Sequence, residues 1–334
     1  MLVHRKFRRK RYLVAVGLLL VAAAIYVFNA SWRVPGPVDP RQELIAHRGV
    51  HQTYYREGLD NETCTAERIE QPSHDLIENT LPSMATGFAA GAAVVELDVH
   101  PTIDGYLAVF HDWTLDCRTD GSGVTRSHDL AFLQSLDLGY GYTADEGESF
   151  PLRGQGVGMM PELRDVLSAF PDGRFLINFK SREAREGDML AAILAENPAW
   201  RQRIWGSYGG DEPTRRAAEL LGTELHSWSR RTLIDCLAVY VGAGWTGYMP
   251  PACHDTVVMV PINVAPWLWG WPNLLQERFA AANSAVLLMG PLEPGDPGTA
   301  GIDTLDMLDQ VPATFSGYIW TKRIEVIGPA LGDR

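Results

Sequence analysis

The sequence predicts an α/β fold, a TIM-type (β/α)8 barrel with long active-site loops, preceded by one N-terminal transmembrane helix. Three observations lead to this fold class. Residues 12–28 form an uncharged apolar run after a strongly basic start, and short apolar segments then alternate with helix-like segments to the end of the 334-residue chain. Two long segments, 51–77 and 113–160, break this alternation. Loops of that length in a compact domain usually belong to binding or catalysis.

The N-terminus has the pattern of a membrane anchor. Residues 1–11 carry six basic residues and no acid, which predicts a cytoplasmic basic segment. Residues 12–30 contain an apolar run just long enough to span a bilayer and are predicted to be a signal-anchor; 31–42 is a Pro-rich linker and 43–334 the barrel domain. This orientation places the domain on the outer, periplasmic or extracellular, face of the cytoplasmic membrane. A cleaved signal peptide is the alternative, and it would release the domain as a secreted protein.

The alternation along the domain predicts its strands and helices. Strands are expected at 44–47, 94–99, 107–111, 175–180, 204–207, 224–228, 257–262, 285–289 and 317–321, and helices at 81–90, 162–170, 188–196, 213–221 and 273–283. Two details do not fit a regular barrel. Nine strands are one too many, and residues 100–106 are too few for a helical crossover, which normally needs a dozen or more residues.

Composition excludes some functions and permits others. The net charge is −12 although the first 11 residues are strongly basic, so the rest of the chain is acidic and is not expected to bind nucleic acid. With 46% hydrophobic and 21% charged residues, the chain is not expected to be disordered. Its four cysteines have no C-x-x-C spacing, which favours structural disulfides in an exported domain over a zinc site. Three pairings are possible.

Two acids interrupt the apolar run at 94–99. Because side chains two apart share one face of a strand, Glu96 and Asp98 point one way and the neighbouring Val95, Leu97 and Val99 the other. Carboxylates within an apolar strand need a cation or hydrogen bonds to offset their charge. Oxygen ligands of this kind suit Ca²⁺ or Mg²⁺. The alternative is an exposed edge strand with solvated acids, but valines on both of its faces argue against that.

Further polar residues follow the predicted strands. His47 and His111 both end apolar runs, which places them at the C-terminal ends of strands, where the catalytic residues of such barrels lie. Two histidines converging on a carboxylate pair indicate general acid/base catalysis. Arg48 offers a planar fork for a phosphate, and Asn178 and Lys180 share one face of the run at 175–180.

These residues together resemble the glycerophosphodiester phosphodiesterase family, whose members are metal-dependent α/β barrels. The resemblance is dense over residues 44–180 and thinner afterwards. Its motifs are His47-Arg48-Gly49, Glu78-Asn79-Thr80, Val95-Glu96-Leu97-Asp98-Val99 with Thr102 and Asp104-Gly105, Val109-Phe110-His111-Asp112, Leu115-Asp116, Gly121-Ser122-Gly123, Leu136-Asp137-Leu138-Gly139 and Ile319-Trp320-Thr321. Each tripeptide is weak evidence by itself, but the ordered set at these separations is specific.

The resemblance implies a reaction and the residues at its centre. It implies metal-dependent hydrolysis of glycerophosphodiesters to glycerol 3-phosphate and an alcohol. His47 and His111 would be the general acid/base pair, one assisting the attacking oxygen and the other protonating the leaving alkoxide. Glu96 and Asp98 would hold one divalent metal, Ca²⁺ or Mg²⁺, that neutralises charge on the phosphodiester.

The same resemblance assigns the substrate contacts. Arg48 and Lys180 would bind the non-bridging phosphate oxygens, Glu78 would be a further acid near the metal or the glycerol, and Trp320 would line the pocket. For Asn79 we expect only an N-cap of the helix that follows.

Two positions depart from the family pattern. Asn178 stands where the family usually has a glutamate as third metal ligand; its carbonyl can still bind the metal, but the site loses one negative charge. Lys322 stands where an acid or asparagine is usual. The first departure leaves a second hypothesis open, a membrane-anchored protein that binds phosphodiesters and turns them over weakly.

A third hypothesis concerns the substrate. Three tryptophans lie within residues 267–271, and they could contact acyl chains, which would make the protein a phospholipase D-like enzyme acting on lysophospholipids. Alternatively, they cover the barrel as packed side chains. Neither a serine-hydrolase G-x-S-x-G sequence nor a nucleotide-binding G-x-G-x-x-G or Walker sequence follows a predicted strand, so other hydrolase and nucleotide-dependent classes have no support.

Overall fold

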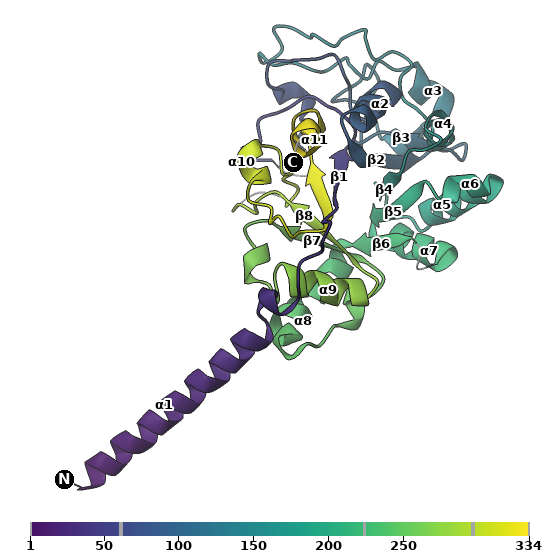
Figure 1. The fold of residues 1–334 in the computed structure, drawn as a ribbon. Coiled ribbons are helices and arrows are strands. Elements are labelled where there is room, and N and C mark those ends of the chain that lie inside the picture. The colour runs from purple at the N-terminus through teal and green to yellow at the C-terminus, as the bar shows by residue number, and fades with distance from the viewer. Residues whose placement is uncertain (1, 60–62, 223–224, 295–297, 333–334) are drawn as a thin grey trace.

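The computed structural model describes residues 2–59, 63–222, 225–294 and 298–332. Its first element, α1 (Leu2–Phe28), is one continuous helix that projects away from the domain (Figure 1). Within α1, Lys10–Phe28 is long enough and apolar enough to cross a membrane, with a mean hydropathy of 2.2 and no burial against the domain.

The end of α1 is held by the domain through Asn29. Its side-chain amide donates to the carbonyl oxygen of Trp245 at 2.8 Å and accepts from Arg278 at 3.0 Å. A 3-10 turn, η1 (Ser31–Arg33), follows, and the hydroxyl of Ser31 accepts from the backbone of Asn273 at 3.0 Å. These contacts fix where the helix leaves the domain.

The predicted barrel is confirmed. Among the described residues, eight parallel strands follow the order β6-β5-β4-β2-β1-β9-β8-β7. Their bounds are β1 (Gln42–His47), β2 (Ala92–Pro101), β4 (Phe175–Phe179), β5 (Ile204–Gly209), β6 (His226–Ser229), β7 (Val257–Pro261), β8 (Ala285–Met289) and β9 (Gly317–Thr321). At the seam between β6 and β7, the Thr256 hydroxyl donates to the Ser227 carbonyl at 3.2 Å. Position 224, the start of the predicted sixth strand, lies outside the described residues.

The ninth predicted strand is real, but it is not a barrel strand. β3 (Leu107–Val109) pairs antiparallel with the end of β2, with Val99 opposite Val109. The expectation that His111 ends a parallel barrel strand is therefore wrong: β2 runs past the end of the barrel and β3 returns beside it, which explains the short link at 100–106. The chain arrives back at the level of Asp98, whose carbonyl accepts from the backbone of Phe110 at 3.0 Å.

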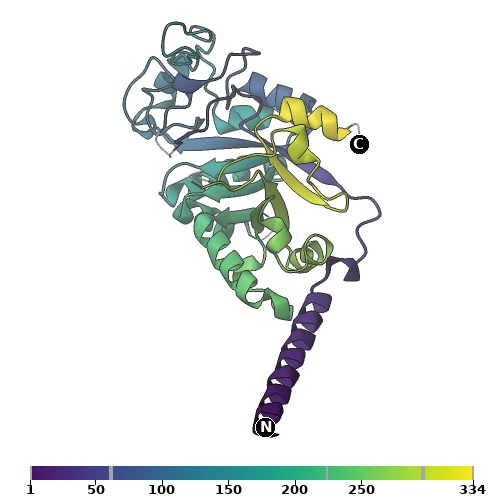
Figure 2. The same cartoon turned by 90° about the vertical axis from the view of Figure 1, so that its left-hand side faces the viewer.

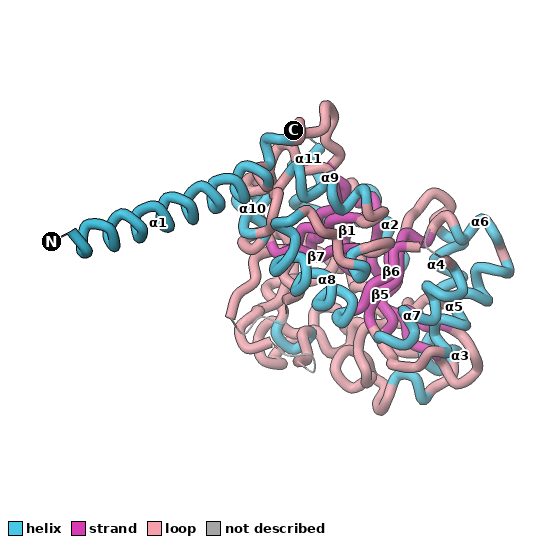
Figure 3. Tube along the Cα trace, turned by 90° about the horizontal axis from the view of Figure 1, so that it is seen from below, coloured by secondary structure: helices cyan, strands magenta, loops and turns pink. Residues whose placement is uncertain are grey.

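Helices and loops surround the strands, as the view from below shows (Figure 3). The helices are α2 (Leu81–Ala89), α3 (Leu130–Ser135), α4 (Leu163–Ala169), α5 (Arg185–Glu196), α6 (Pro198–Arg201), α7 (Asp211–Leu221), α8 (Arg230–Ala243), α9 (Asn273–Ala281), α10 (Leu305–Leu308) and α11 (Ile324–Gly332). All five predicted helices are present within a few residues of the expected bounds. The longest of the helices around the barrel, α8, was not predicted, because residues 230–243 are rich in Val, Ile and Leu and have a strand-like composition.

The two faces of the strands form two cores. Outward-facing residues such as Val95 and Leu97 pack with the surrounding helices, whereas Val94, Leu176 and Trp320 fill the interior of the barrel. Because side chains alternate along a strand, the face that carries Val94 at the bottom of the barrel carries polar side chains higher up. The apolar lower layer thus supports a polar upper layer at the C-terminal ends of the strands.

Two disulfides connect segments outside the barrel. Cys236–Cys253 joins α8 to the turn before β7, and Cys64–Cys117 joins the two long loops. These loops share a small core of their own, which includes Ile77, Leu138 and Tyr142. They lie at the end of the domain remote from α1 in both side views (Figures 1 and 2).

Candidate active site

The predicted site residues come together at the C-terminal ends of the strands. His47 is the last residue of β1 and is in register with Glu96 of β2, while Asp98 is in register with Asn178 of β4. Glu96 and Asp98 both have 0% exposed surface, so the alternative of a solvated edge strand is wrong. They project into the barrel because they continue the inward face of β2.

The turn after β1 positions Arg48. Its φ is 58°, and the next residue, Gly49, has φ of 76°. A Cβ atom on Gly49 would lie 2.4 Å from the hydroxyl oxygen of Ser83 and 2.7 Å from its backbone, so this position requires glycine. The backbone N–H of Arg48 donates to the carbonyl of Glu96 at 3.0 Å. Gly49 therefore packs directly against Ser83 of α2, and the turn at residues 48 and 49 directs the chain back over the barrel.

Arg48 and Asn79 hold one oxygen of Asp98. The Nε of Arg48 forms an ion pair with Oδ2 at 2.9 Å, and the amide of Asn79 donates to the same oxygen at 3.0 Å. The backbone N–H of Asp98 donates in return to Asn79 at 3.2 Å. The expectation for Asn79 is therefore wrong: Thr80 is the N-cap of α2, and Asn79, with φ of 59°, faces the carboxylate.

Asn178 and Lys180 approach the other oxygen of Asp98. The Asn178 amide donates to Oδ1 at 2.8 Å, and the Lys180 ammonium lies 3.7 Å from it. Although burial acts against it, Arg48 and Lys180 lower the pKa of Asp98 to about 2. Asp98 is thus a permanent anion at the centre of the site.

Glu96 is in a different environment. Its Oε1 accepts from the hydroxyl of Tyr208 at 2.7 Å, and its Oε2 from the backbone of Arg48 at 3.2 Å. Burial and repulsion by Asp98 raise the pKa of Glu96 to about 8. The nearby cations, Arg48 and Lys180, do not offset burial and the charge of Asp98 at this carboxylate. Tyr208 was not expected in the site, since nothing in its local sequence distinguishes it from a core tyrosine.

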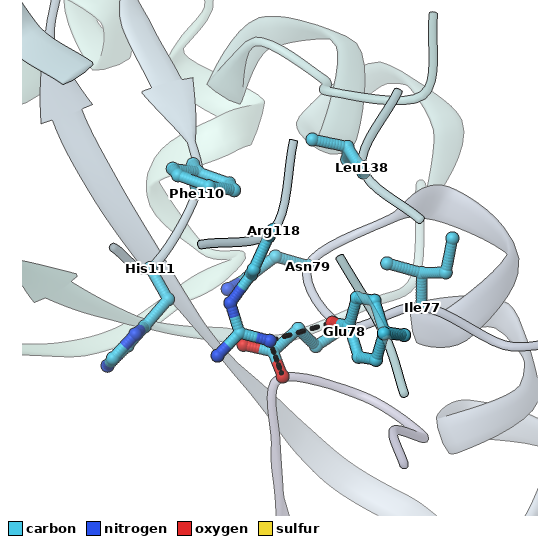
Figure 4. A pocket seen from close by; sticks show the side chains of 8 residues that line it. Ile77, Glu78, Asn79, Phe110, His111, Arg118 and Leu138 are labelled. Atoms are coloured by element: carbon cyan, nitrogen blue, oxygen red, sulfur yellow. Dashed lines mark hydrogen bonds and ion pairs between the residues drawn. The ribbon is translucent and has the colours of Figure 1, made fainter. Parts of the chain in front are cut away.

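Glu78 connects Arg48 to a second arginine. It forms ion pairs with Arg48 at 2.8 Å and with Arg118 at 3.0 Å, as the close view shows for the second pair (Figure 4). Despite its burial, these two arginines lower the pKa of Glu78 to about 2. The Nε of Arg118 also binds Asp112 at 2.7 Å, and Asp112 lies 2.5 Å from Nδ1 of His111. Arg118 was missed because only the fold brings residue 118 to residues 78 and 112.

Both predicted catalytic histidines lie near cations; His47 is buried, whereas His111 is partly exposed. Burial, and then the charge of Arg48, keep the pKa of His47 and that of His111 well below the usual value. Both imidazoles are therefore neutral near pH 7, each with one ring nitrogen able to accept a proton. The ring of Trp320 lies 5.1 Å from that of His47 and forms the wall behind it.

The carboxylate pair fits a divalent cation bound through oxygen atoms. No three His, Cys, Asp or Glu side chains in the described ranges form a metal-binding group, so such an ion would depend on Glu96, Asp98 and the amide oxygen of Asn178. Asn178 now directs its nitrogen to Asp98, and a rotation of the amide would present its oxygen instead. Oxygen ligands alone suit Ca²⁺ or Mg²⁺, and an added positive charge would let Glu96 ionise.

The tryptophans at 267–271 divide between an exposed position and packed positions. Trp267 is 85% exposed, whereas Trp269 and Trp271 pack partly against the outer core. Trp269 also donates its indole N–H to the Val241 carbonyl at 2.8 Å. Two of the three tryptophans therefore cover the barrel.

Comparisons with known proteins find one recurring similarity. The sequence profile described as the glycerophosphoryl diester phosphodiesterase family matches residues 47–198. The glycerophosphodiester phosphodiesterase of Caldanaerobacter subterraneus is 34% identical over 124 residues, which cover 37% of this chain and 46% of that protein. The chain thus spans less than half the length of the curated relatives it matches first.

Solved structures share the fold. The crystal structure of a glycerophosphodiester phosphodiesterase from Agrobacterium tumefaciens matches with a TM-score of 0.58 and 18% identity, over 86% of this chain and 99% of the other. An Oleispira antarctica phosphodiesterase, solved in complex with the product sn-glycerol-3-phosphate, matches with a TM-score of 0.53 and 18% identity, over 91% and 99% of the two chains. The barrel, the ordered motifs and the profile match over residues 47–198 thus agree in one similarity, that of the chain to the glycerophosphodiester phosphodiesterase family.

Proposed function

We propose that the protein hydrolyses glycerophosphodiesters to glycerol 3-phosphate and an alcohol. The observation that carries the proposal is the placement of two neutral histidines at the end of the barrel that carries the anion Asp98 and its cations: His47 ends β1, and His111 follows Phe110, whose backbone N–H donates to the Asp98 carbonyl. The Oleispira antarctica relative, whose structure contains sn-glycerol-3-phosphate as product, supports the choice of substrate.

The two histidines perform the proton transfers. One neutral imidazole takes a proton from the attacking oxygen and later releases it to solvent, and the other, having taken a proton from solvent, gives it to the alkoxide as its bond to phosphorus breaks. Asp112 accepts a hydrogen bond from Nδ1 of His111, so it sets which ring nitrogen faces the substrate. Arg48 and Lys180 supply positive charge for the non-bridging oxygens.

A divalent cation, Ca²⁺ or Mg²⁺, completes the proposed site. Glu96, Asp98 and Asn178 are the residues that would hold it. The ion supplies charge neutralisation for the phosphodiester and for the charge that grows on it during hydrolysis. Because Asn178 contributes no charge, we expect weak metal affinity, so chelation should remove the ion readily.

Release of the alcohol tests this proposal directly. The full chain in detergent is treated with a chelator and then assayed on glycerophosphocholine and glycerophosphoethanolamine with Ca²⁺, Mg²⁺, Mn²⁺ or Zn²⁺ added back. We expect activity to disappear on chelation and to return with Ca²⁺ or Mg²⁺. Activity that resists chelation would contradict the metal requirement. Binding measured by calorimetry without product under any condition would instead identify a binding protein.

We further propose that α1 anchors the protein in the cytoplasmic membrane, with the barrel on its outer face. The six basic residues before the apolar stretch, and the absence of buried residues within that stretch, support this. The contacts of Asn29 with Trp245 and Arg278 hold the anchor at the end of the domain remote from the long loops (Figure 2). The strand ends that carry the site would therefore lie on the side of the domain away from the bilayer, which favours dissolved glycerophosphodiesters over lysophospholipids held in it.

Membrane fractionation tests the anchor. The full chain should sediment with membranes, resist extraction by carbonate and dissolve in detergent, whereas the double variant Leu18→Arg/Leu19→Arg should leave the membrane fraction. Mass spectrometry of the intact protein locates its mature N-terminus and so tests the alternative of a cleaved signal peptide. A mature N-terminus within residues 20–35 would show that the segment is a cleaved signal peptide.

A further inference from the structure

A buried lysine lies beside His47 without a role in the mechanism above. Lys322 directly follows β9, and its exposed surface is 6%. Ala46 of β1 is in register with Thr321 of β9, so His47 and Lys322 each come one residue after this pair. The register therefore places the lysine at the same end of the barrel as the catalytic histidine.

The ammonium of Lys322 is bound by a tyrosine and not by a carboxylate. It donates to the hydroxyl of Tyr54 at 3.2 Å and lies 5.6 Å from the centre of that ring. The nearby acid, Asp303, uses its Oδ1 to accept from the backbone N–H of Lys322 at 2.7 Å and from the Thr321 hydroxyl at 3.2 Å. None of the ion pairs among the described residues includes Lys322. Its charge is therefore left without a carboxylate partner among the described residues.

A second buried group without a partner lies in the same place. The ring of His51 lies against those of His47 and Tyr54, with its centre 5.4 Å from the first and 6.2 Å from the second. Its Nδ1 pairs with the carbonyl of Gln52 at 2.8 Å, but its buried Nε2 has no hydrogen-bond partner in the part of the chain that the structure describes. Burial lowers the pKa of both His51 and Lys322, and an anion beside them would reverse this effect.

We propose that Lys322, Tyr54 and His51 form a subsite for an anionic group carried by the alcohol part of the substrate. The proposal rests on the phosphodiesterase function proposed above and specifies its substrate class. The preferred substrates are glycerophosphodiesters whose alcohol carries a carboxylate or a phosphate. Choline and ethanolamine esters bind less well, because they would place a second cation beside a buried ammonium.

Three esters of nearly equal size test the subsite. They join glycerol 3-phosphate to glycolate, ethylene glycol or ethanolamine, and so present a carboxylate, a hydroxyl or an ammonium at one position. For the full chain in detergent we expect kcat/KM to fall in that order, by roughly 10- to 100-fold between the first and the last. Values of Kd measured by calorimetry should follow the same order. Equal values for the three esters would overturn the proposal.

Two variants assign the effect to Lys322. Lys322→Met keeps the apolar stem and should remove the preference for the carboxylate ester, while Lys322→Arg should keep it. Arg323→Gln is the matched control, since the guanidinium of Arg323 pairs with Glu325 and not with the pocket; its preference should stay as in the unchanged protein. An equal loss for all three esters in Lys322→Met would contradict the proposal, because the lysine would then act on the shared phosphate.

The outcomes also separate this inference from the function on which it rests. If none of the esters is hydrolysed with any added metal, the proposed function fails, and the order of the Kd values still decides whether the subsite exists. If Lys322→Met does not fold, the comparison of the three esters in the unchanged protein decides the question by itself.

Discussion

Replacing His47 or His111 by alanine is expected to lower kcat for glycerophosphodiester hydrolysis roughly 10²- to 10⁴-fold, the usual contribution of a positioned general acid or base. Each ring is neutral, so neither variant removes a charge that stabilises the fold. KM should change much less than kcat. The measurement is a steady-state assay of alcohol release on the full chain with the metal present.

A histidine outside the site serves as the control. His254 is exposed on the turn before β7, at the opposite end of the barrel strands, and His254→Ala should leave kcat unchanged. The double variant His47→Ala/His111→Ala should be barely slower than either single variant, because the two residues act in one reaction. Near-normal activity in either single variant would remove that histidine from the mechanism.

Removing the Cys64–Cys117 disulfide is the second change with a large expected effect. The bridge closes a loop with a sequence separation of 53 residues, and the chain-entropy relation gives about 4 kcal/mol of stabilisation for that length. The bridge also holds Arg118 in place, because Arg118 follows Cys117 and donates to the Thr65 hydroxyl at 2.6 Å. The variant Cys64→Ser/Cys117→Ser should therefore lose activity as well as stability.

The other disulfide is a matched control. Cys236–Cys253 has a sequence separation of 17 residues, for which the same relation gives about 3 kcal/mol. The variant Cys236→Ser/Cys253→Ser should unfold at lower urea concentration but keep its kcat at low temperature. If both double variants lost the same fraction of activity at equal folded population, the first bridge would have no role in positioning Arg118.

Much of the fold could be predicted from the sequence because its signals are local. Apolar runs of four to six residues mark β1, β2, β4 and β8, and alternation along β2 places Glu96 and Asp98 on one face whatever the strand contacts. The rule that parallel strands end at one edge then brings His47 to the same place. These inferences need only the chain within a few residues of each position.

Other features depend on contacts that local sequence does not encode. The strand at 107–109 has the same composition as a barrel strand, and only its pairing with β2 shows that it runs the other way. Asn79 and Asp98 are 19 residues apart, and Tyr208 and Glu96 are 112 apart, so their hydrogen bonds exist only once the barrel has formed.

By itself, then, the sequence determined the barrel, the apolar N-terminal segment and the identity of the acids and histidines at the ends of the strands. The tertiary structure alone decided which cation faces which acid. Arg118 joins Glu78, Lys180 approaches Asp98, and Lys322 meets Tyr54 across 268 residues of sequence. The physical reason is that periodicity and turn chemistry act over a few residues, whereas the charge balance of a buried site is the sum over every strand that ends there.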